Sequence, residues 1–280
     1  MRIVTFRRNG IVQHGVRHGG SIAVHPAATS AVELAIHAAA DSAAQATAQQ
    51  VPLADVELLP PVPRPGKIIC IGLNYRAHAI EGGNAIPEYP AVFMRGATSL
   101  TPSGGPILYP ECSDKLDYEA ELAVVIGRAA TRVSVANALA HVAGYSCFND
   151  GSVRDYQRKS TQWTMGKNFD CTGGFGPELV TPDELPVGAS GLRIVARLNG
   201  QVMQDSSTTD MIFDVATLVA TLSEAMTLEP GDVIATGTPA GVGYARKPPV
   251  YMRPGDVIEI EIEGVGILTN TVARRAATNA

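Results

Sequence analysis

The apolar residues of this chain are densest between Leu116 and Gly127, and the rest of the pattern extends outward from that stretch. Small and branched apolar residues follow one another from Leu122 to Ile126, and the run ends at a glycine. A short, nearly continuous apolar run bounded by glycine is typical of a β-strand that is buried on both faces. The sequence therefore predicts a central strand over residues 116–127.

Shorter apolar runs predict further strands and a few helices. Asn199-Gly200, between two apolar runs, predicts a tight hairpin with a type I′ turn. Strands are expected over residues 2–6, 11–16, 21–24, 67–73, 91–94, 144–148, 192–198, 201–204, 233–235, 257–262 and 267–272. Helices are expected over residues 30–49, 134–142, 152–160 and 210–226.

A proline-rich segment divides the chain. Residues 60–65 contain four prolines, which neither a helix nor a central strand tolerates, so a stiff linker is expected there. It separates a small N-terminal α+β domain, residues 1–62, from a larger domain, residues 67–275.

Composition narrows the possible partners. The chain has 280 residues, 45% of them hydrophobic, and a formal net charge of −5. No basic stripe points to nucleic acid, and no apolar run is long enough to cross a bilayer. Arg7 and Arg8 follow the first apolar residues, the wrong order for a signal peptide. The four cysteines form no CxxC pair and are expected to be buried thiols in a reducing cytoplasm, with disulfides as the alternative.

Two acidic residues open the central strand. Glu119 and Glu121 are two residues apart, so a strand directs both carboxylates to the same side. Burying two like charges without a cation is costly, and Mg²⁺ is typically bound by one or two carboxylates with water and substrate oxygens. Asp150, at the end of another apolar run, is the natural third ligand. Exposed glutamates at a strand start, and an aspartate capping the next helix, are the alternatives.

A possible base lies near the start of the larger domain. His78 and Glu81 are three residues apart, which places them side by side on one helical turn. A carboxylate beside an imidazole orients it and raises its basicity, as a general base requires. Gly82, Gly83 and Pro87 predict that this short helix lies in a lid-like loop. A casual contact on a surface helix is the alternative.

Further polar residues follow the acidic ones. Arg154, Gln157 and Arg158 lie on overlapping faces of one predicted helix. Lys167 could stabilise negative charge that develops during a reaction; the alternative is a lysine on the surface without a chemical role. The loop after residue 235 contains Gly237 and Thr238, whose N–H groups and hydroxyl suit an anion such as a carboxylate; a plain turn is the alternative.

The ordered motifs resemble those of the fumarylacetoacetate hydrolase family. They are LNYRAHAIEGG, DYEAELAVVIG, YSCFNDGSVRDYQ, QWTMGKNFD, NGQVMQDSSTTDMIFDV, LEPGDVIATGTPAGVG and IEIEIEGVGILTN, spread over residues 67–273. The resemblance implies a mixed α+β, mainly β fold, the β-roll of that family, with a small N-terminal domain. It also implies a homodimer.

The resemblance assigns roles to individual residues. It implies Mg²⁺ or Mn²⁺ at Glu119, Glu121 and Asp150. It implies that His78 and Glu81 activate water and that Lys167 steadies an oxyanion or enolate. Substrate contacts are implied for Arg154, Gln157, the Gly237–Thr238 loop and Arg95, which stands where many members have lysine. Asn74 stands where some members carry a further acidic ligand, so three protein carboxylates are expected.

The implied reaction is hydrolysis of a C–C bond in an acylpyruvate or related 2,4-diketo acid. The alternatives that use the same site are decarboxylation of an oxaloacetate-type acid and isomerisation of a 2-hydroxy-dienoate. A binding protein that retains the fold without catalysis is the rival from another class, and a metal-dependent assay separates it from the enzymes.

Overall fold

The central sheet of this protein joins its N-terminal segment to its core. In the computed structural model, which describes residues 1–37 and 48–275, the large sheet has twelve strands. Ten of them run in the order β4 (Gln50–Pro52), β3 (Ser21–Val24), β2 (Ile11–His18), β1 (Arg2–Arg8), β14 (Gly173–Val180), β12 (Val142–Asp150), β11 (Ala120–Ile126), β17 (Val233–Ala235), β6 (Ile68–Gly72) and β7 (Ala91–Arg95). Outside this path, β5 (Glu57–Leu59) pairs with β1, and β8 (Leu100–Pro102) pairs with β14.

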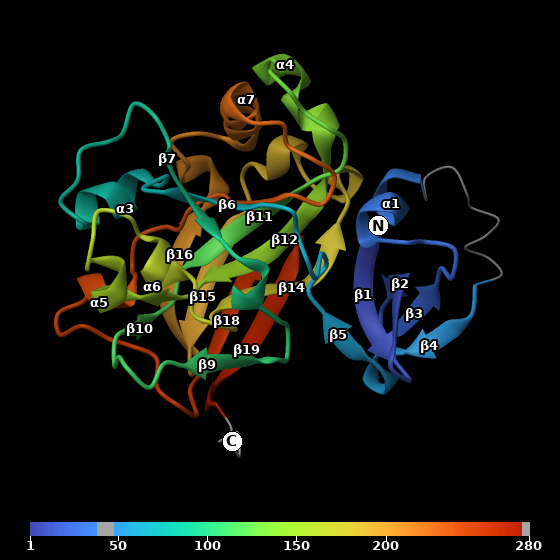
Figure 1. Ribbon diagram of the computed structural model, residues 1–280, viewed down its shortest axis with the longest axis horizontal. Coiled ribbons are helices and arrows are strands. Elements are labelled where there is room, and N and C mark those ends of the chain that lie inside the picture. Colours follow the sequence, from blue (N-terminus) through green and yellow to red (C-terminus); the bar gives the residue numbers. More distant parts are fainter. Residues whose placement is uncertain (38–47, 276–280) are drawn as a thin grey trace.

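A second, five-stranded sheet packs near the first (Figure 1). Its order is β16 (Gln201–Ser207), β15 (Arg193–Leu198), β18 (Val257–Ile262), β19 (Gly266–Arg274) and β9 (Pro106–Tyr109). The short strands β10 (Leu116–Asp117) and β13 (Ser152–Val153) pair separately. Asn199 and Gly200 both have positive φ, 53° and 79°, so the predicted hairpin turn between β15 and β16 is confirmed.

Helices are few and short, and they lie around the sheets. The α-helices are α1 (Ala31–His37), α3 (Arg76–Glu81), α4 (Val135–Ala138), α5 (Arg154–Gln157), α6 (Thr164–Lys167) and α7 (Val215–Ala225). The 3₁₀ helices are η2 (Leu53–Asp55), η3 (Ala97–Ser99), η4 (Leu139–His141), η5 (Pro182–Glu184), η6 (Val187–Ala189), η7 (Thr208–Asp210) and η8 (Gly243–Ala245). The described chain is therefore mixed α+β and mainly β, as the resemblance implied, and none of its helices has the length and apolar character to span a bilayer.

Strand β11 is buried along its whole length, which confirms the predicted central strand. Leu122, Val124 and Ile126 face an apolar core shared with β15, β18 and α7. Ala123 and Val125 face a second core, to which α1 contributes. The predicted strand is however interrupted, because Tyr118 and Glu119 lie between β10 and β11.

Two predicted helices are shorter than expected, and a third lies partly outside the described residues. The helix expected over residues 210–226 begins at Val215, because the Asp214 side chain accepts the backbone N–H of Thr217 and caps it there. The helix expected over 152–160 is the strand β13 followed by α5. The helix expected over 30–49 is observed as α1, and residues 38–47 lie outside the described part of the chain.

The N-terminal segment is tied to the main sheet by charge as well as by strand pairing. Strand β1 pairs with β14, and the buried carboxylate of Glu178 on β14 accepts hydrogen bonds from Arg2 and from Arg17. Figure 1 shows β1–β4 at the right, beside the main body. The proposed division at residues 62–67 falls in a loop between β5 and β6.

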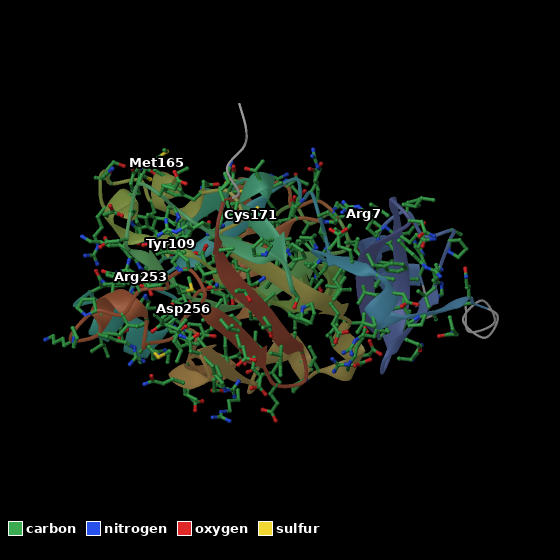
Figure 2. All side chains as sticks on the ribbon, turned by 90° about the horizontal axis from the view of Figure 1, so that it is seen from below. Arg7, Tyr109, Met165, Cys171, Arg253 and Asp256 are labelled. Carbon is green, nitrogen blue, oxygen red and sulfur yellow. The ribbon has the colours of Figure 1, made fainter. Side chains whose placement is uncertain are left out.

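The cysteines only partly match the prediction of buried thiols. All four are free; Cys70 and Cys147 are buried, but Cys112 is exposed and Cys171 is half-buried. Cys112 lies in a polar turn between β9 and β10, where no apolar layer covers it. Figure 2 shows Cys171 near the surface, and Tyr109 beside Arg253, whose guanidinium donates to the tyrosine hydroxyl at 2.7 Å.

Candidate active site and metal centre

Three buried carboxylates meet at one edge of the central sheet. Glu121 is the second residue of β11, Glu119 directly precedes that strand, and Asp150 ends the neighbouring strand β12. One oxygen from each lies within 4.8 Å of the others, and the residues are 5%, 1% and 0% exposed. We call these three residues the acidic trio. The prediction that the two glutamates converge, with Asp150 as a third, is confirmed in its geometry.

The trio is only partly neutralised by cations. Lys167 Nζ lies 2.6 Å from a Glu119 oxygen and 2.5 Å from an Asp150 oxygen, and it is itself buried. Arg154 Nη2 lies 2.7 Å from the other oxygen of Glu119. The side chain of Glu121 has no such cation in contact among the described residues, and its hydrogen-bond donor is the backbone N–H of Gly237 at 2.9 Å.

The pKa values of the two glutamates are therefore shifted in opposite directions. Burial alone would raise the pKa of Glu119. The positive charges of Lys167 and Arg154 outweigh this effect and lower the pKa to about 2. Burial raises the pKa of Glu121 well above its usual value, and the charges of Asp150 and Glu119 add to that effect. Without a bound cation, Glu121 is therefore the glutamate of the trio that more readily takes up a proton.

A divalent metal ion fits this arrangement. The donor set consists of carboxylate oxygens, which hard cations such as Mg²⁺ and Mn²⁺ prefer. The uncompensated carboxylate of Glu121 is the charge that such an ion would neutralise. Asn74, which replaces an acidic residue of some family members, makes no contribution: its amide is used by the backbone groups of Phe213 and Thr236.

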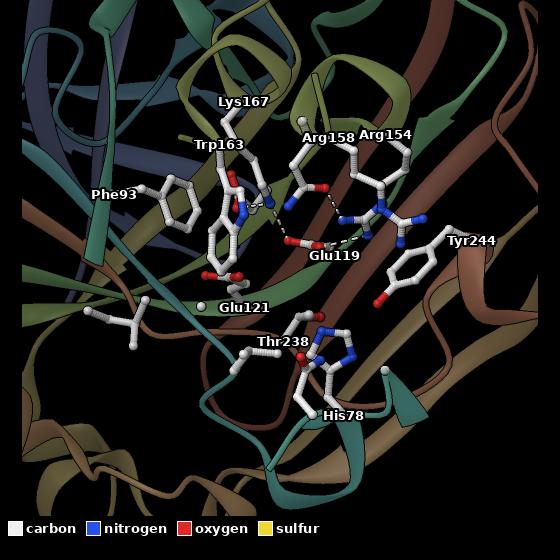
Figure 3. Close-up of a pocket in the computed structure, with 17 residues that line it drawn as sticks. His78, Phe93, Glu119, Glu121, Arg154, Arg158, Trp163, Lys167, Thr238 and Tyr244 are labelled. Carbon is white, nitrogen blue, oxygen red and sulfur yellow. Dashed lines mark hydrogen bonds and ion pairs between the residues drawn. The ribbon is translucent and has the colours of Figure 1, made fainter. Parts of the chain in front are cut away.

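The trio opens into a small polar cavity of about 260 Å³ (Figure 3). Gly72 leaves room for the ring of Trp163, because a Cβ at this glycine would run into the indole. Trp163 in turn packs edge-on against Phe93, with ring centroids 5.5 Å apart. The lining residues are Ile71, Gly72, Leu73, His78, Gly82, Asn84, Phe93, Glu119, Glu121, Asp150, Arg154, Gln157, Arg158, Trp163, Lys167, Thr238 and Tyr244.

His78 reaches the same cavity from the short helix α3. Its Nδ1 lies 3.4 Å from Glu81 Oε2, on one helical turn as the spacing predicted. Both oxygens of Glu81 accept the backbone N–H of Gly241, at 3.0 and 3.1 Å, which orients the carboxylate. We call His78 and Glu81 the His–Glu pair. His78 lines the cavity, and Glu81 stands behind it.

Two residues expected to bind substrate lie elsewhere. Arg95 does not line the cavity: it is buried behind Asp150, with Nη1 at 2.5 Å from an oxygen of that residue, so it holds a carboxylate of the trio in place. The N–H of Gly237 is already used by Glu121, which leaves it unavailable to a substrate anion. Each of these two groups contacts a buried acid and is not part of the cavity lining.

The other expected contacts do line the cavity. Gln157 accepts a hydrogen bond from Arg154 Nη1 at 2.9 Å. The hydroxyl of Thr238 accepts a hydrogen bond from Gln204 at 2.8 Å and keeps its own proton for another acceptor. Lys167 lies between two carboxylates of the trio rather than on the surface.

Sequence reasoning missed Asp117, a fully buried acid behind Arg154. It accepts Arg154 Nε at 2.7 Å, and also the backbone N–H groups of Gly243 at 2.8 Å and Tyr244 at 3.0 Å. It thereby positions both Arg154 and the ring of Tyr244. A local signal was present, since this aspartate stands two residues before Glu119, but its partners are distant in sequence.

Two protein-family models match this chain, one over each of its two parts. Residues 67–273 match the model described as "Fumarylacetoacetate (FAA) hydrolase C-terminal", and residues 1–61 match the model "Rv2993c-like, N-terminal". A curated relative, the oxaloacetate tautomerase YisK of Bacillus subtilis, is 46% identical over 224 residues, which cover 79% of this chain and 74% of the relative.

Solved structures share the fold over nearly the whole chain. A fumarylacetoacetate hydrolase from Exiguobacterium antarcticum is 37% identical with a TM-score of 0.88, covering 98% of this chain and 100% of that one. A maleylpyruvate hydrolase from Sphingobium, solved with manganese and pyruvate, is 30% identical with a TM-score of 0.82, covering 99% of this chain and 100% of that one. The acidic trio and this manganese-bound relative together suggest a divalent metal for this chain.

Proposed function

The chain belongs to the fumarylacetoacetate hydrolase family, and from that premise we propose that it is a divalent-metal-dependent enzyme acting on a small 2-oxo acid. The first candidate reaction is the interconversion of the keto and enol forms of oxaloacetate. The observation that carries the proposal is the convergence of the acidic trio and His78 on one cavity of about 260 Å³. So small a space favours a short substrate.

Keto–enol interconversion of oxaloacetate is not among the reactions expected from the sequence, where C–C hydrolysis came first. Curated relatives more than 40% identical to this chain are named oxaloacetate tautomerases, and the hydrolase with known ligands is 30% identical. Tautomerisation is a net transfer of a proton between carbon and oxygen, and no water has to attack a carbonyl carbon, so the His–Glu pair can serve as the base at carbon.

The acidic trio would hold the ion, Mg²⁺ or Mn²⁺. When bound, the ion supplies Lewis-acid polarisation of the 2-oxo group and a template for the adjacent carboxylate. Burial lowers the pKa of Lys167, but the charges of Asp150 and Glu119 raise it more, so its ammonium stays charged and can stabilise an enolate oxygen. Arg154 and Gln157 would bind the substrate carboxylate, with the Thr238 hydroxyl as a further donor.

His78 would move the proton. In the keto-to-enol direction its imidazole would take a proton from the carbon next to the 2-oxo group, and the resulting enolate oxygen would then take up a proton from solvent; the reverse direction runs both transfers backwards. Glu81, held by the N–H of Gly241, orients the ring through Nδ1 and stabilises its charged form. The short helix α3, with glycines at its end, is the part of the site suited to close over a substrate.

Hydrolysis of an acylpyruvate is the second candidate. It is supported by the maleylpyruvate hydrolase whose structure holds manganese and pyruvate. In that reaction the His–Glu pair would remove a proton from water, which attacks the distal carbonyl carbon; the C–C bond breaks and its electron pair leaves in pyruvate enolate, which is then protonated. Decarboxylation and dienoate isomerisation remain further uses of the same residues. We also propose a cytoplasmic homodimer.

One experiment separates these functions. The purified protein, with Mg²⁺ or Mn²⁺ and with or without chelator, is given oxaloacetate, and both the ultraviolet absorbance of the enol and the formation of pyruvate are followed. We expect metal-dependent exchange of enol and keto forms without pyruvate. Pyruvate formation would favour decarboxylation, and metal-dependent loss of acetylpyruvate would favour hydrolysis. No metal-dependent change in any substrate would favour the non-catalytic binding protein.

A further inference from the structure

One cation of the cavity has no acidic partner. Lys167 and Arg154 contact the acidic trio and Asp117. Arg158 follows α5, lines the same cavity and is exposed, and within residues 1–37 and 48–275 no carboxylate forms an ion pair with it. Its charge is therefore available to a ligand.

The ring of Tyr244 holds this free cation in place. The guanidinium carbon of Arg158 lies 4.6 Å from the ring centroid, and that of Arg154 lies 4.5 Å from the same centroid (Figure 3). The buried carboxylate of Asp117 accepts hydrogen bonds from Arg154 and from the backbone N–H of Tyr244, and so fixes the position of the tyrosine relative to Arg154. A stacked guanidinium keeps the N–H groups of its edge free for a carboxylate.

We propose that Arg158, stacked on Tyr244, binds the distal carboxylate of the substrate and so selects 2-oxo dicarboxylates over 2-oxo monocarboxylates. The inference rests on the proposed function and narrows its substrate class. The acidic trio and Arg158 line one cavity of about 260 Å³, so a single short acid can reach both. A planar carboxylate and a guanidinium edge match in geometry, and the pair forms charge-assisted hydrogen bonds.

The preference for a dicarboxylate follows from which cations of the cavity are already paired with acids. With the metal bound, the first carboxylate and the 2-oxo group lie at the trio, where Arg154 and Lys167 already offset the acids. A second carboxylate needs another cation, and Arg158 is the cation of the cavity lining whose charge is not used in an ion pair. A monocarboxylate leaves that cation to water and gains nothing from it.

The test compares two acids of equal chain length, 2-oxoglutarate and 2-oxopentanoate. Their affinities for the Mg²⁺-loaded protein are measured by calorimetry for the wild type, Arg158→Gln and the control Lys159→Gln. Lys159 is the next exposed cation along the chain and lies against Tyr156, not in the cavity, so the control removes the same charge. We expect Arg158→Gln to weaken 2-oxoglutarate about tenfold and 2-oxopentanoate less than twofold. Lys159→Gln should leave both unchanged.

Substitutions of Tyr244 test whether its ring positions Arg158. Tyr244→Leu removes the ring and should lose part of the same selectivity, while Tyr244→Phe should keep it. Equal affinity of the wild type for the two acids, or an equal loss for both acids in Arg158→Gln, would overturn the proposal.

Turnover keeps this inference separate from the proposed function. In Arg158→Gln, kcat/KM for oxaloacetate should fall about tenfold. Selective binding without turnover of any 2-oxo acid would leave the role of Arg158 standing and remove the proposed reaction. Turnover of oxaloacetate that does not depend on Arg158 would do the reverse.

Discussion

The two halves of the candidate site are built differently. Glu121 and Asp150 stand on β11 and β12, adjacent central strands whose residues are buried throughout, and Glu119 directly precedes β11. The His–Glu pair stands on α3, a six-residue helix at the periphery, and Glu81 is held to the rest of the protein by the N–H of Gly241. Ile80, between them, is 68% exposed. Rigid strands fix the charges in place, and a peripheral helix brings the base.

Because the two halves are built on different elements, we expect that metal binding and proton transfer can be impaired independently of each other. Four charged groups outside α3 contact the trio or its partners, so the geometry of the trio does not depend on that helix; they are Arg95, Arg154, Lys167 and Asp117. The base, in contrast, rests on one turn of helix. Substitutions in one half should leave the function of the other half intact.

The largest effect on metal binding is expected at Glu121. Glu121→Gln keeps the shape of the side chain but removes the carboxylate that lacks a cation, so affinity for Mn²⁺ should fall about 100-fold or more. Titration calorimetry with Mn²⁺ measures this loss. A chelator should lower the Tm of the wild type and leave that of the variant unchanged. Affinity equal to that of the wild type would show that the trio is not the metal site.

The next effect is expected in the other half. His78→Ala should lower kcat for the enol–keto exchange by about 10²- to 10⁴-fold, because the general base is lost. Its affinity for Mn²⁺ should stay within about twofold of the wild type. Unchanged turnover would remove His78 from the mechanism, and a parallel loss of metal would contradict the separation of the two halves.

A matched pair of apolar truncations tests the difference in rigidity. Leu122 on β11 is fully buried, so Leu122→Ala should lower the free energy of unfolding by about 2–5 kcal/mol. Ile80→Ala on the exposed face of α3 should change it by less than about 0.5 kcal/mol. Denaturant unfolding measures both. A similar loss in the two variants would mean that α3 is as much part of the core as β11.

The smallest effect is expected at Glu81. Glu81→Gln still accepts the N–H of Gly241 and still contacts His78, but it no longer stabilises a charged imidazole, so kcat should fall only about tenfold. Steady-state kinetics at saturating metal measures this. A loss as large as that of His78→Ala would make the carboxylate itself the base.

Part of this site could be predicted from local sequence alone. A strand alternates its side chains, so Glu119 and Glu121 had to share a side; a helical turn brings residues three apart together, so His78 and Glu81 had to be neighbours. Asn199-Gly200 specified its hairpin turn in the same way. The helix expected over residues 152–160 was misread because β13 pairs with β10, a distant segment that periodicity does not reveal.

Only the tertiary structure decided how the charges pair. The order of strands in the sheet brings Asp150 beside Glu119, and the loops then direct Arg95 to Asp150 and the N–H of Gly237 to Glu121, away from the substrate. Among the residues that the structure describes, the same pairing leaves Arg158 without an acidic partner. Local propensity acts over a few residues, whereas electrostatic compensation inside a protein depends on which distant groups are buried together.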